Sequence, residues 1–445
     1  MIDAFKNALK ITELRKRIIF TALLLIIYRV GAHITIPGID NEAVSKFFDD
    51  LMGRVGLIGF VDLFSGGALR NMTIFALGIQ PYISASIILQ LLTVVVPYLE
   101  QLSKEPDGKK KITQYTRYGT VILAAVQGIG ISFMLRNPAS LGLGFTGSIV
   151  KSAIPLWQFH FLAVVTLAAG TSFIMWLGEQ ITERGIGNGI SLIITAGIVA
   201  GIPSAISSLY TSLTTEGDQQ LGLIELVFFI ALIVIAVMGT IYITLAVRKI
   251  PVQHSRRVVG RRIYGGQANH IPLRVNAAGM IPIIFAVTLI SFPQTLVTFI
   301  PSELLQNLVL KVYSPLIYWP VYALLIIFFT YFYTAVQINP VDWADNLRKS
   351  GGYIPGIRPG RATAQYIERT LDRITLPGAV FLAAIAVLPA LLQKKLGVQA
   401  GISGASVLIV VGVMLDTMNQ IESHLVSRHY DGFLKGTKLR GRRGR

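Results

Sequence analysis

The chain has 445 residues, of which 53% are hydrophobic and only 14% are charged. An ordinary soluble domain carries about 25% charged residues, so this composition excludes a water-soluble protein of the same length. Cysteine is absent, which excludes disulfide frameworks, thiol nucleophiles and cysteine metal sites, and the formal net charge is +17. An apolar but basic chain is typical of a multi-spanning membrane protein whose positive charge is gathered on one side.

Ten stretches of the sequence are long and apolar enough to cross a bilayer, which takes about 20 residues of helix. They begin near Ile18, Met72, Tyr118, Leu156, Ile186, Leu223, Val275, Leu316, Leu376 and Ile402. The first is followed by nine more and has no small-residue cleavage site after it, so we expect a span and not a signal peptide. The sequence therefore predicts an all-α polytopic membrane protein with ten transmembrane helices.

Lysine and arginine are distributed unevenly between the two sides of these spans. The N-terminal segment, every second loop and the C-terminal tail hold 31 of them, whereas the opposite loops hold 8, and Arg29 lies inside the first span. Cytoplasmic loops carry the excess of basic residues in membrane proteins. We therefore expect both termini on the cytoplasmic side.

The external stretch 207–222 contains no basic residue and divides the spans five and five. The sequence predicts an N-terminal half over 1–206, an external hinge at 207–222, a C-terminal half over 223–421 and a basic cytoplasmic tail over 422–445. Paired halves of this kind occur in transporters built from repeats, but the two halves show no convincing sequence repeat.

Motifs of catalysis and cofactor binding are missing from the sequence. It contains neither a G-x-x-x-x-G-K-[ST] phosphate loop nor an H-E-x-x-H zinc motif, and its six histidines show no ligand spacing. The glycine-rich run 185–189 opens a predicted span, which favours a close-packed helix start over a nucleotide loop. We expect no enzymatic activity, no metal site and no cofactor.

Ionisable residues are scarce inside the predicted spans, where only Arg29, Glu225 and Asp416 occur. Residues of this kind can form proton or ion relays. Glu225 and Asp416 lie near span ends, and for all three we favour snorkelling or pairing near the interface. This scarcity argues against an ion-coupled small-solute transporter, which is the main alternative function for such a chain.

A short apolar segment precedes the second span. Phe60, Leu63 and Phe64 fall on one helical face, and Gly66 and Gly67 then break the helix. A half-helix joined to a full span by a glycine break is typical of a re-entrant segment, which must lie inside protein or beside water. An amphipathic turn on the outer leaflet explains the residues equally well, so both readings stay open.

Aliphatic pairs recur one helical turn apart in two of the spans, as Ile79 with Ile83 and Ile190 with Ile194. By spacing alone, each pair predicts only a packing face. The amides of Gln127 and Asn276 are polar groups within spans, which either pack between helices or line a wet path.

Two cytoplasmic loops are longer than topology requires. The loop 247–274 has seven basic residues and no acidic one, which favours a protruding arm that docks on ribosomal RNA or an acidic protein face. The loop 339–373 has six basic and four acidic residues, and its glycines and prolines predict tight turns that present Arg358 at a fixed place.

Five motifs in order along the chain resemble the SecY family, whose members form the central subunit of the protein-conducting channel in the bacterial cytoplasmic membrane. They are FSGGAL at 64–69, ALGIQPYISASI at 76–87, GIGNGIS at 185–191, RKIPVQ at 248–253 and PGIRPG at 355–360. The similarity runs from the N-terminus into the tenth span. The tail 439–445 is the part that resembles the family least.

The resemblance implies an hourglass channel between two five-helix halves, with a plug at about 58–70 that includes Phe60, Leu63, Phe64, Gly66, Gly67 and Leu69. It implies an apolar pore ring formed by Ile79, Ile83, Ile190, Ile194, Ile284 and Ile409. It places Gln127 and Asn276 at polar positions of a lateral gate. It assigns partner docking to Arg256, Arg257, Arg261, Arg262, Arg358 and Arg361.

The same resemblance implies a set of partners. These are SecE-like and SecG-like small membrane subunits, the SecA motor ATPase, the ribosome, signal sequences and nascent polypeptides, and membrane lipid. Because the chain has no ATP site, we expect the driving energy to come from a partner. A pore-free assembly scaffold is a third possibility, and co-purification of a SecE-like subunit would distinguish the channel from a solute transporter.

Overall fold

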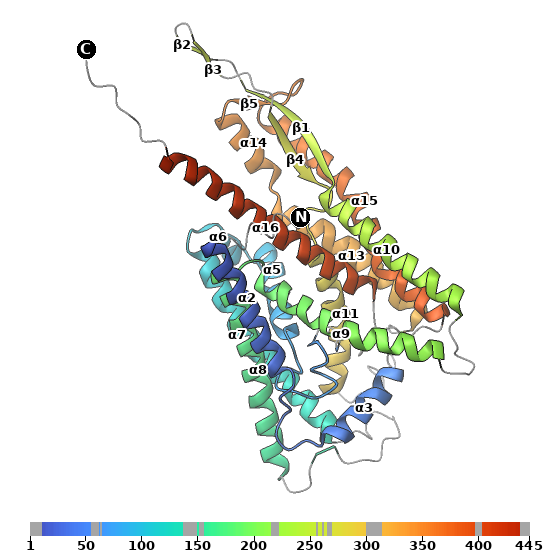
Figure 1. The fold of residues 1–445 in the computed structure, drawn as a ribbon. Helices are drawn as coiled ribbons and strands as arrows, with labels where there is room; N and C mark the ends of the chain where they lie inside the picture. The colour runs from blue at the N-terminus through green and yellow to red at the C-terminus, as the bar shows by residue number, and fades with distance from the viewer. Residues whose placement is uncertain are drawn as a thin grey trace. The chain divides into compact units, whose positions relative to one another are not determined.

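The computed structural model describes residues 11–54, 62, 65–136, 149–150, 155–214, 222–254, 257–259, 262–264, 269–299, 314–396 and 403–436 (Figure 1). In chain order the helices are α2 (Thr12–Gly31), α3 (Asn41–Arg54), α5 (Gln80–Val95), α6 (Pro97–Lys104), α7 (Gly108–Arg136), α8 (Leu156–Arg184), α9 (Gly189–Thr214), α10 (Leu223–Leu245), α11 (Ile281–Phe299), α13 (Pro315–Gln337), α14 (Pro340–Lys349), α15 (Arg361–Leu396) and α16 (Gly404–Gly436). The strands are β1 (Val247–His254), β2 (Arg257–Val259), β3 (Arg262–Tyr264), β4 (Asn269–Arg274) and β5 (Gly352–Tyr353).

The prediction of a polytopic helical protein is confirmed. Seven of the described helices are long and apolar enough to cross a membrane, and an eighth span results if α5 and α6, which are bent by 100° at their junction, count as one. The other two predicted spans also contain helices. These are α2, which carries charged residues in its first turns, and α11, whose described apolar part is shorter.

Two helices begin several residues after the start of the apolar stretch that predicted them, because a turn precedes each helix. The second span begins at Gln80 and not near Met72, since Met72 and Gly78 have φ angles of 43° and 56° that an α-helix does not tolerate. The seventh begins at Ile281 and not near Val275. Asn276 therefore lies in the turn before α11 and not in a span, which corrects its predicted position.

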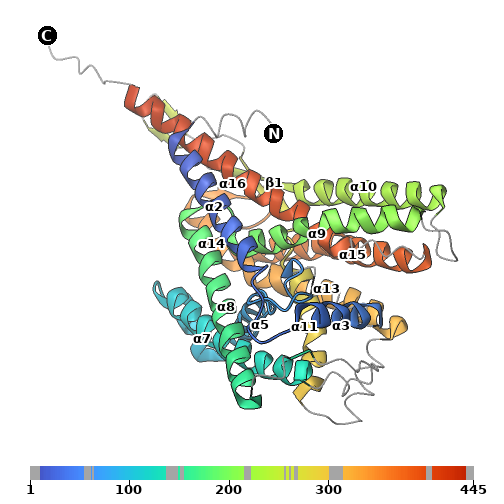
Figure 2. The same cartoon turned by 60° about the horizontal axis from the view of Figure 1, so that its bottom comes forward.

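The chain forms two compact units, Met1–Pro203 with Val413–Arg445, and Ser204–Gly412. Both boundaries fall inside helices, the first within α9 and the second within α16. In the first unit α7 packs along α8, as Figure 2 shows, and α5 packs on α7. In the second unit α13 packs against both α11 and α15.

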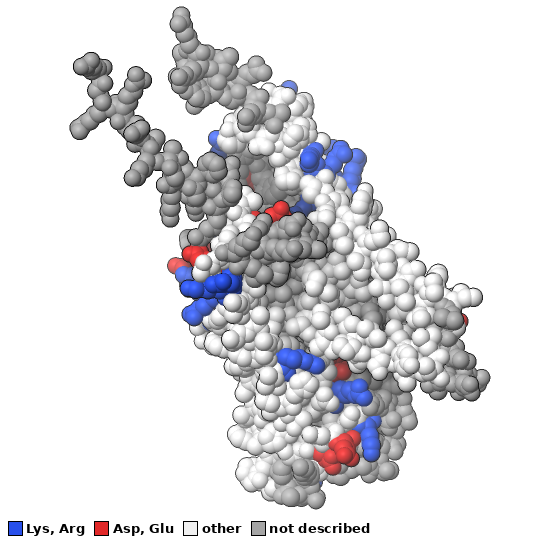
Figure 3. Space-filling model, in the orientation of Figure 1, with Lys and Arg blue, Asp and Glu red and all other residues white. Residues whose placement is uncertain are grey.

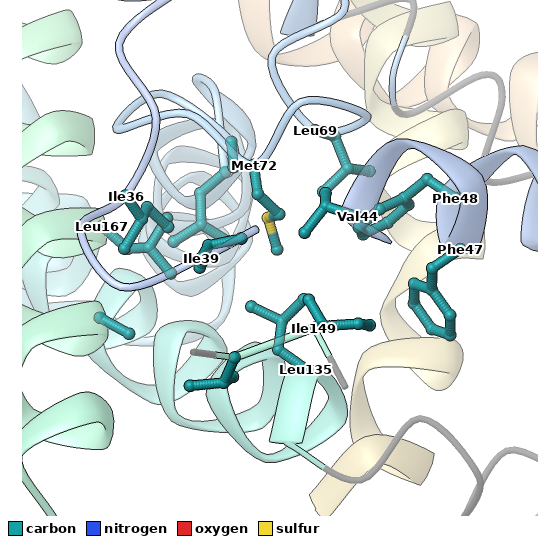
Figure 4. Close-up of a cluster of buried hydrophobic side chains, with 14 of the residues drawn as sticks. Ile36, Ile39, Val44, Phe47, Phe48, Leu69, Met72, Leu135, Ile149 and Leu167 are labelled. Atoms are coloured by element: carbon teal, nitrogen blue, oxygen red, sulfur yellow. The ribbon is translucent and has the colours of Figure 1, made fainter. Parts of the chain in front are cut away.

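A core stabilises the first unit next to the predicted plug, and we name it the external core because the loop that contributes to it is predicted to lie outside the cytoplasm. Helix α3, which the sequence analysis did not predict, buries Val44, Phe47 and Phe48 in this core. Figure 4 shows Ile36, Ile39, Val44, Phe47, Phe48, Leu69, Met72, Leu135, Ile149 and Leu167 converging there. Burial of so many large apolar side chains anchors the chain around Leu69 and Met72.

The two long loops of the second unit form a small sheet that the sequence analysis also missed. Its strand order is β4-β1-β5, and both pairings are antiparallel. Strand β1 of the loop 247–274 thus pairs with β5 of the loop 339–373. The sheet covers a core that buries Ile250, Val252, Leu273, Ile354, Ile367 and Leu371.

Candidate functional site

The pair Ile79 and Ile83 lies where α5 begins. Ile79 is the residue before the first helical turn, and the amide of Ile83 donates to its carbonyl at 3.1 Å. Both side chains are buried. Ile79 follows the left-handed Gly78, so its place is set by the turn and not by the helix that the sequence predicted.

The pair Ile190 and Ile194 lies on α9 of the same unit. Ile194 is buried and Ile190 is partly buried. Gly197 follows at the next step of the same stripe, since spacings of four and three residues stay on one helical face. One face of α9 thus carries two branched aliphatic side chains, Ile190 and Ile194, followed by the bare backbone of Gly197.

The turn at Ser65 and Gly66 lies against both of these elements. The Cβ atom of Ser65 is 3.6 Å from the position that a Cβ on Gly78 would take. A Cβ added to Gly66 would lie 2.9 Å from the Cα of Gly197. The described end of the predicted plug therefore lies beside Gly78, which precedes Ile79, and beside Gly197, which follows Ile194 on the same face of α9.

A hydrogen-bond network fixes the shape of this turn. The Ser65 hydroxyl donates to the Asp62 carbonyl at 2.8 Å and accepts from the Leu69 amide at 3.1 Å, while Asp62 Oδ1 accepts from the Arg70 amide at 2.8 Å. Asp62 lies outside the spanning helices, and burial raises the pKa of its carboxyl, with the Arg70 amide lowering it in part. Gly66 and Gly67 have φ angles of 68° and 84°, which explains why glycine occupies both positions.

Two residues of α2 bind the same turn. The Tyr28 hydroxyl donates to the Ser65 carbonyl at 3.2 Å, and Arg29 Nη1 donates to the Gly66 carbonyl at 2.6 Å. The interpretation from sequence, that Arg29 snorkels or pairs near the interface, did not include this contact. The only sign of a special role for Arg29 in the sequence was its position inside an apolar span, because the Gly66 carbonyl that it binds lies 37 residues further along the chain.

The other predicted ring residues belong to the second unit. Ile284 lies on α11 with 7% of its surface exposed, and Ile409 lies on α16 and is fully buried. Of the predicted plug, Phe60, Leu63 and Phe64 lie outside the described residues, whereas Gly66, Gly67 and Leu69 are described. In the first unit, the structure places the turn of the described plug residues beside Gly78, which precedes Ile79, and beside Gly197 on the helix of Ile194.

The predicted gate residues are both buried. Gln127 lies within α7, and Asn276 lies in the turn before α11. Among the described residues, Asn276 Oδ1 is one of four buried side-chain atoms without a hydrogen-bond partner. A buried amide in this state is costly unless a further partner satisfies it.

The predicted docking residues are spread over the strands and turns of the second unit. Arg257 and Arg262 lie in β2 and β3, which pair with each other, and Arg256 and Arg261 lie outside the described residues. Arg361 is the exposed first residue of α15. Figure 3 shows basic side chains gathered over β1 and β4, whereas the surface over α10 carries almost no charge.

The turn that carries Arg358 is held from both sides. Before it, the Ile357 amide donates to the Ile354 carbonyl at 3.0 Å, and Ile354 is buried in the core beneath the sheet. After it, the hydroxyl of buried Thr363 donates to the Arg358 carbonyl at 2.9 Å. The Arg358 side chain is exposed. A guanidinium on a fixed backbone can make bidentate contacts with acidic groups of a partner.

Comparisons with known proteins agree on one family. The family model SecY matches residues 73–418. The chain is 45% identical, over 449 aligned positions that cover all of both chains, to the protein translocase subunit SecY of Thermotoga maritima.

Two solved structures resemble the chain in fold. One is described as a protein-conducting channel, with 18% identity, a TM-score of 0.60 and coverage of 95% of this chain and 94% of that one. The other is Sec61 in the canine ribosome-channel complex from the endoplasmic reticulum, with 18% identity, a TM-score of 0.55 and the same coverage.

Proposed function

The chain belongs to the SecY family and is the central subunit of a protein-conducting channel, and we propose that it passes unfolded secretory polypeptides across the bacterial cytoplasmic membrane. The observation that carries this proposal is the 45% identity with a translocase subunit over the full length of both chains. The chain is a multi-pass membrane protein, and the distribution of its basic residues supports two cytoplasmic termini.

We assign the pore constriction to Ile79, Ile83, Ile190, Ile194, Ile284 and Ile409. Branched aliphatic side chains offer an ion no ligands, so an ion must lose its hydration shell to pass. A translocating polypeptide fills the constriction and maintains the seal. The halves that carry these residues are 1–206 and 223–421, joined at 207–222.

We assign the plug to about 58–70. The contacts of Ser65 with Gly78 and of Gly66 with Gly197 support this assignment, because they put the described end of the segment next to Ile79 and Ile194. The alternative of an amphipathic turn on the outer leaflet does not explain why Gly66 packs on the backbone of a spanning helix.

Lateral release of apolar client segments is the second part of the proposal. About 20 apolar residues favour hydrocarbon over water strongly enough to leave the channel for lipid. Gln127 and Asn276 are the proposed polar gate residues, and the lack of a partner for Asn276 Oδ1 among the described residues supports a role in binding a passing segment or a further subunit.

Energy for transport comes from partners. We propose that SecA and the ribosome dock on the loops 247–274 and 339–373, through Arg256, Arg257, Arg261, Arg262, Arg358 and Arg361. The ribosome-bound state of the canine Sec61 channel supports the ribosome as a partner. SecE-like and SecG-like subunits complete the membrane complex, and lipid surrounds it. Nothing in the comparisons supports the alternative of an ion-coupled small-solute transporter.

The test is ATP-driven import of a secretory precursor into vesicles that contain the chain, a SecE-like subunit and SecA. We expect protease-protected precursor only when all three and ATP are present. Vesicles with an unrelated ten-span protein at the same density provide the control. Absence of import, under conditions in which a Thermotoga maritima channel works, would reject the proposal.

A further inference from the structure

Two neighbouring side chains of α2 bind two neighbouring carbonyls of the plug. Tyr28 donates to Ser65 and Arg29 donates to Gly66, at 3.2 and 2.6 Å. Consecutive side chains of a helix point about 100° apart, so Tyr28 and Arg29 bind the Ser65–Gly66 turn from two directions. The Arg29 bond is charge-assisted, which makes it the stronger of the two.

The backbone of α9 also packs closely against this turn. A Cβ added to Gly66 would lie 2.9 Å from the Cα of Gly197 and 3.2 Å from Arg29 Nη1, and a Cβ added to Gly78 would lie 3.6 Å from the Ser65 Cβ. The turn is therefore held by side chains of α2 and by the main chain of the elements that carry the proposed pore ring.

The chain that follows the turn is anchored independently of Tyr28 and Arg29. Leu69 and Met72 are buried in the external core. Backbone bonds from Ile36 to Met72 and from Ile74 to Ile34, at 3.0 and 2.8 Å, join this stretch to the chain after α2. A displacement of the plug that leaves Leu69 and Met72 in place has to change the chain before them, where Gly66 and Gly67 have left-handed φ angles.

We propose that Tyr28 and Arg29 form a clamp that holds the plug in its resting position, and that a translocating polypeptide must break both hydrogen bonds to move the plug. These are positioning residues, since they act on the turn and not on the client. The proposal rests on the assignment of 58–70 as the plug.

The test measures thiol labelling of a single cysteine placed at Phe64, in a chain that has no native cysteine. The channel is assembled with its small subunits in vesicles, with and without a jammed precursor. Arg29→Met removes the charged donor, and we expect labelling at rest to become roughly tenfold faster, because a charge-assisted hydrogen bond contributes about that factor to an equilibrium. Tyr28→Phe should act in the same direction by a smaller factor.

Three further variants separate a clamp from a general structural role. Arg29→Lys keeps one charged donor for one carbonyl, so it should restore slow labelling at rest. Arg136→Met removes a positive charge from the end of another span, and Tyr242→Phe removes an exposed hydroxyl. Both should label like the parent chain. If Arg29→Met does not accumulate in the membrane, Tyr28→Phe is judged by the same criterion.

The outcomes distinguish the clamp from the proposed function. Labelling rates of Arg29→Met and Tyr28→Phe at rest that equal the rate of the parent chain would overturn the clamp, whatever effect the jammed precursor has on labelling. Faster labelling at rest in these variants, without any effect of the jammed precursor on the parent chain, would support the clamp and contradict displacement of the plug during transport. Equal acceleration by Arg29→Met and Arg29→Lys would also overturn the clamp.

Discussion

Tyr353 and Gln253 are 100 residues apart in the sequence, and the Tyr353 hydroxyl donates to Gln253 Oε1 at 3.2 Å. The bond lies where β5 pairs with β1, with His254 opposite Gly352 in the next register position. The loops 247–274 and 339–373 therefore share one sheet and one core, although the sequence presents them as separate arms. Arg358 follows that sheet directly.

Arg358→Glu should abolish SecA-driven import while leaving membrane insertion and binding of the small subunit intact. The side chain is exposed, so its replacement should change the free energy of unfolding by no more than about half a kcal/mol. Arg358→Ala should be milder and Arg361→Ala milder still. Import rate at matched channel amounts, read together with SecA ATPase stimulation, is the measurement, and near-normal import by Arg358→Glu would exclude this arginine as a motor contact.

Thr363→Val should slow the same import reaction several-fold. The Arg358 carbonyl loses its hydrogen-bond donor, so the backbone of the turn becomes less rigid. Thr363→Ser keeps the hydroxyl and should import normally. Thr370→Val is the matched control, since the Thr370 hydroxyl makes a comparable bond to the Tyr366 carbonyl at 2.7 Å on the same helix. Equal defects in Thr363→Val and Thr370→Val would show that the effect is not specific to the Arg358 turn.

Ile284→Asn should raise resting ion conductance in planar bilayers and loosen discrimination among signal sequences, because an amide lowers the dehydration barrier at the constriction. Ile409→Asn should do the same. Ile283→Asn buries an amide at the neighbouring position, on a different face of α11. It should therefore destabilise the protein without raising its ion conductance. Unchanged conductance after several ring positions are substituted together would remove them from the pore.

Gly66→Ala should raise resting conductance more than Gly67→Ala. Both positions have left-handed φ angles, so alanine is strained at each by about 1 kcal/mol. Only at Gly66 does the added Cβ also collide with Gly197, whereas nothing lies within 4 Å of a Cβ on Gly67. Single-channel recording of the two variants gives the comparison, and equal conductance would show that contact with α9 does not hold the plug.

Phe47→Ala should lower the free energy of unfolding by about 3–5 kcal/mol, because it opens a cavity in the external core. Phe161→Ala is the control, since that ring is 68% exposed on α8 and leaves no cavity. Thermal unfolding of detergent-solubilised complexes measures both. Similar melting temperatures of Phe47→Ala and Phe161→Ala would show that α3 does not stabilise the first unit.

Much of the helical fold was predictable from hydropathy. Helices α8 and α10 begin at Leu156 and Leu223, the residues that the sequence predicted. The stretches that begin near Met72 and Val275 include more than the helices for one reason, since the turns before α5 and α11 are also largely apolar. Strand β1 was missed because only two of its alternate residues, Ile250 and Val252, are buried, and β5 was missed because two residues are too few to show a period.

The site could be predicted only in part. Spacing placed Ile190 and Ile194 on one face, and family motifs assigned them a role, but neither indicated that Gly197 continues the stripe and receives Gly66. The contacts of Tyr28 and Arg29 were beyond prediction, because a backbone carbonyl as an acceptor has no sequence signature. Arg29 was visible only as a charge in an apolar span.

The sheet shared by the loops 247–274 and 339–373 has a thermodynamic consequence for their ligands. Where the partners of both loops bind more tightly when β1 and β5 are paired, each partner stabilises that pairing and raises the affinity for the other, by the same factor in both directions. Occupancy of the arm at 247–274 and occupancy of the Arg358 turn are then not independent quantities. Affinities measured for the proposed ribosome and motor partners then become a coupled pair, and each has to be determined with the concentration of the other held fixed.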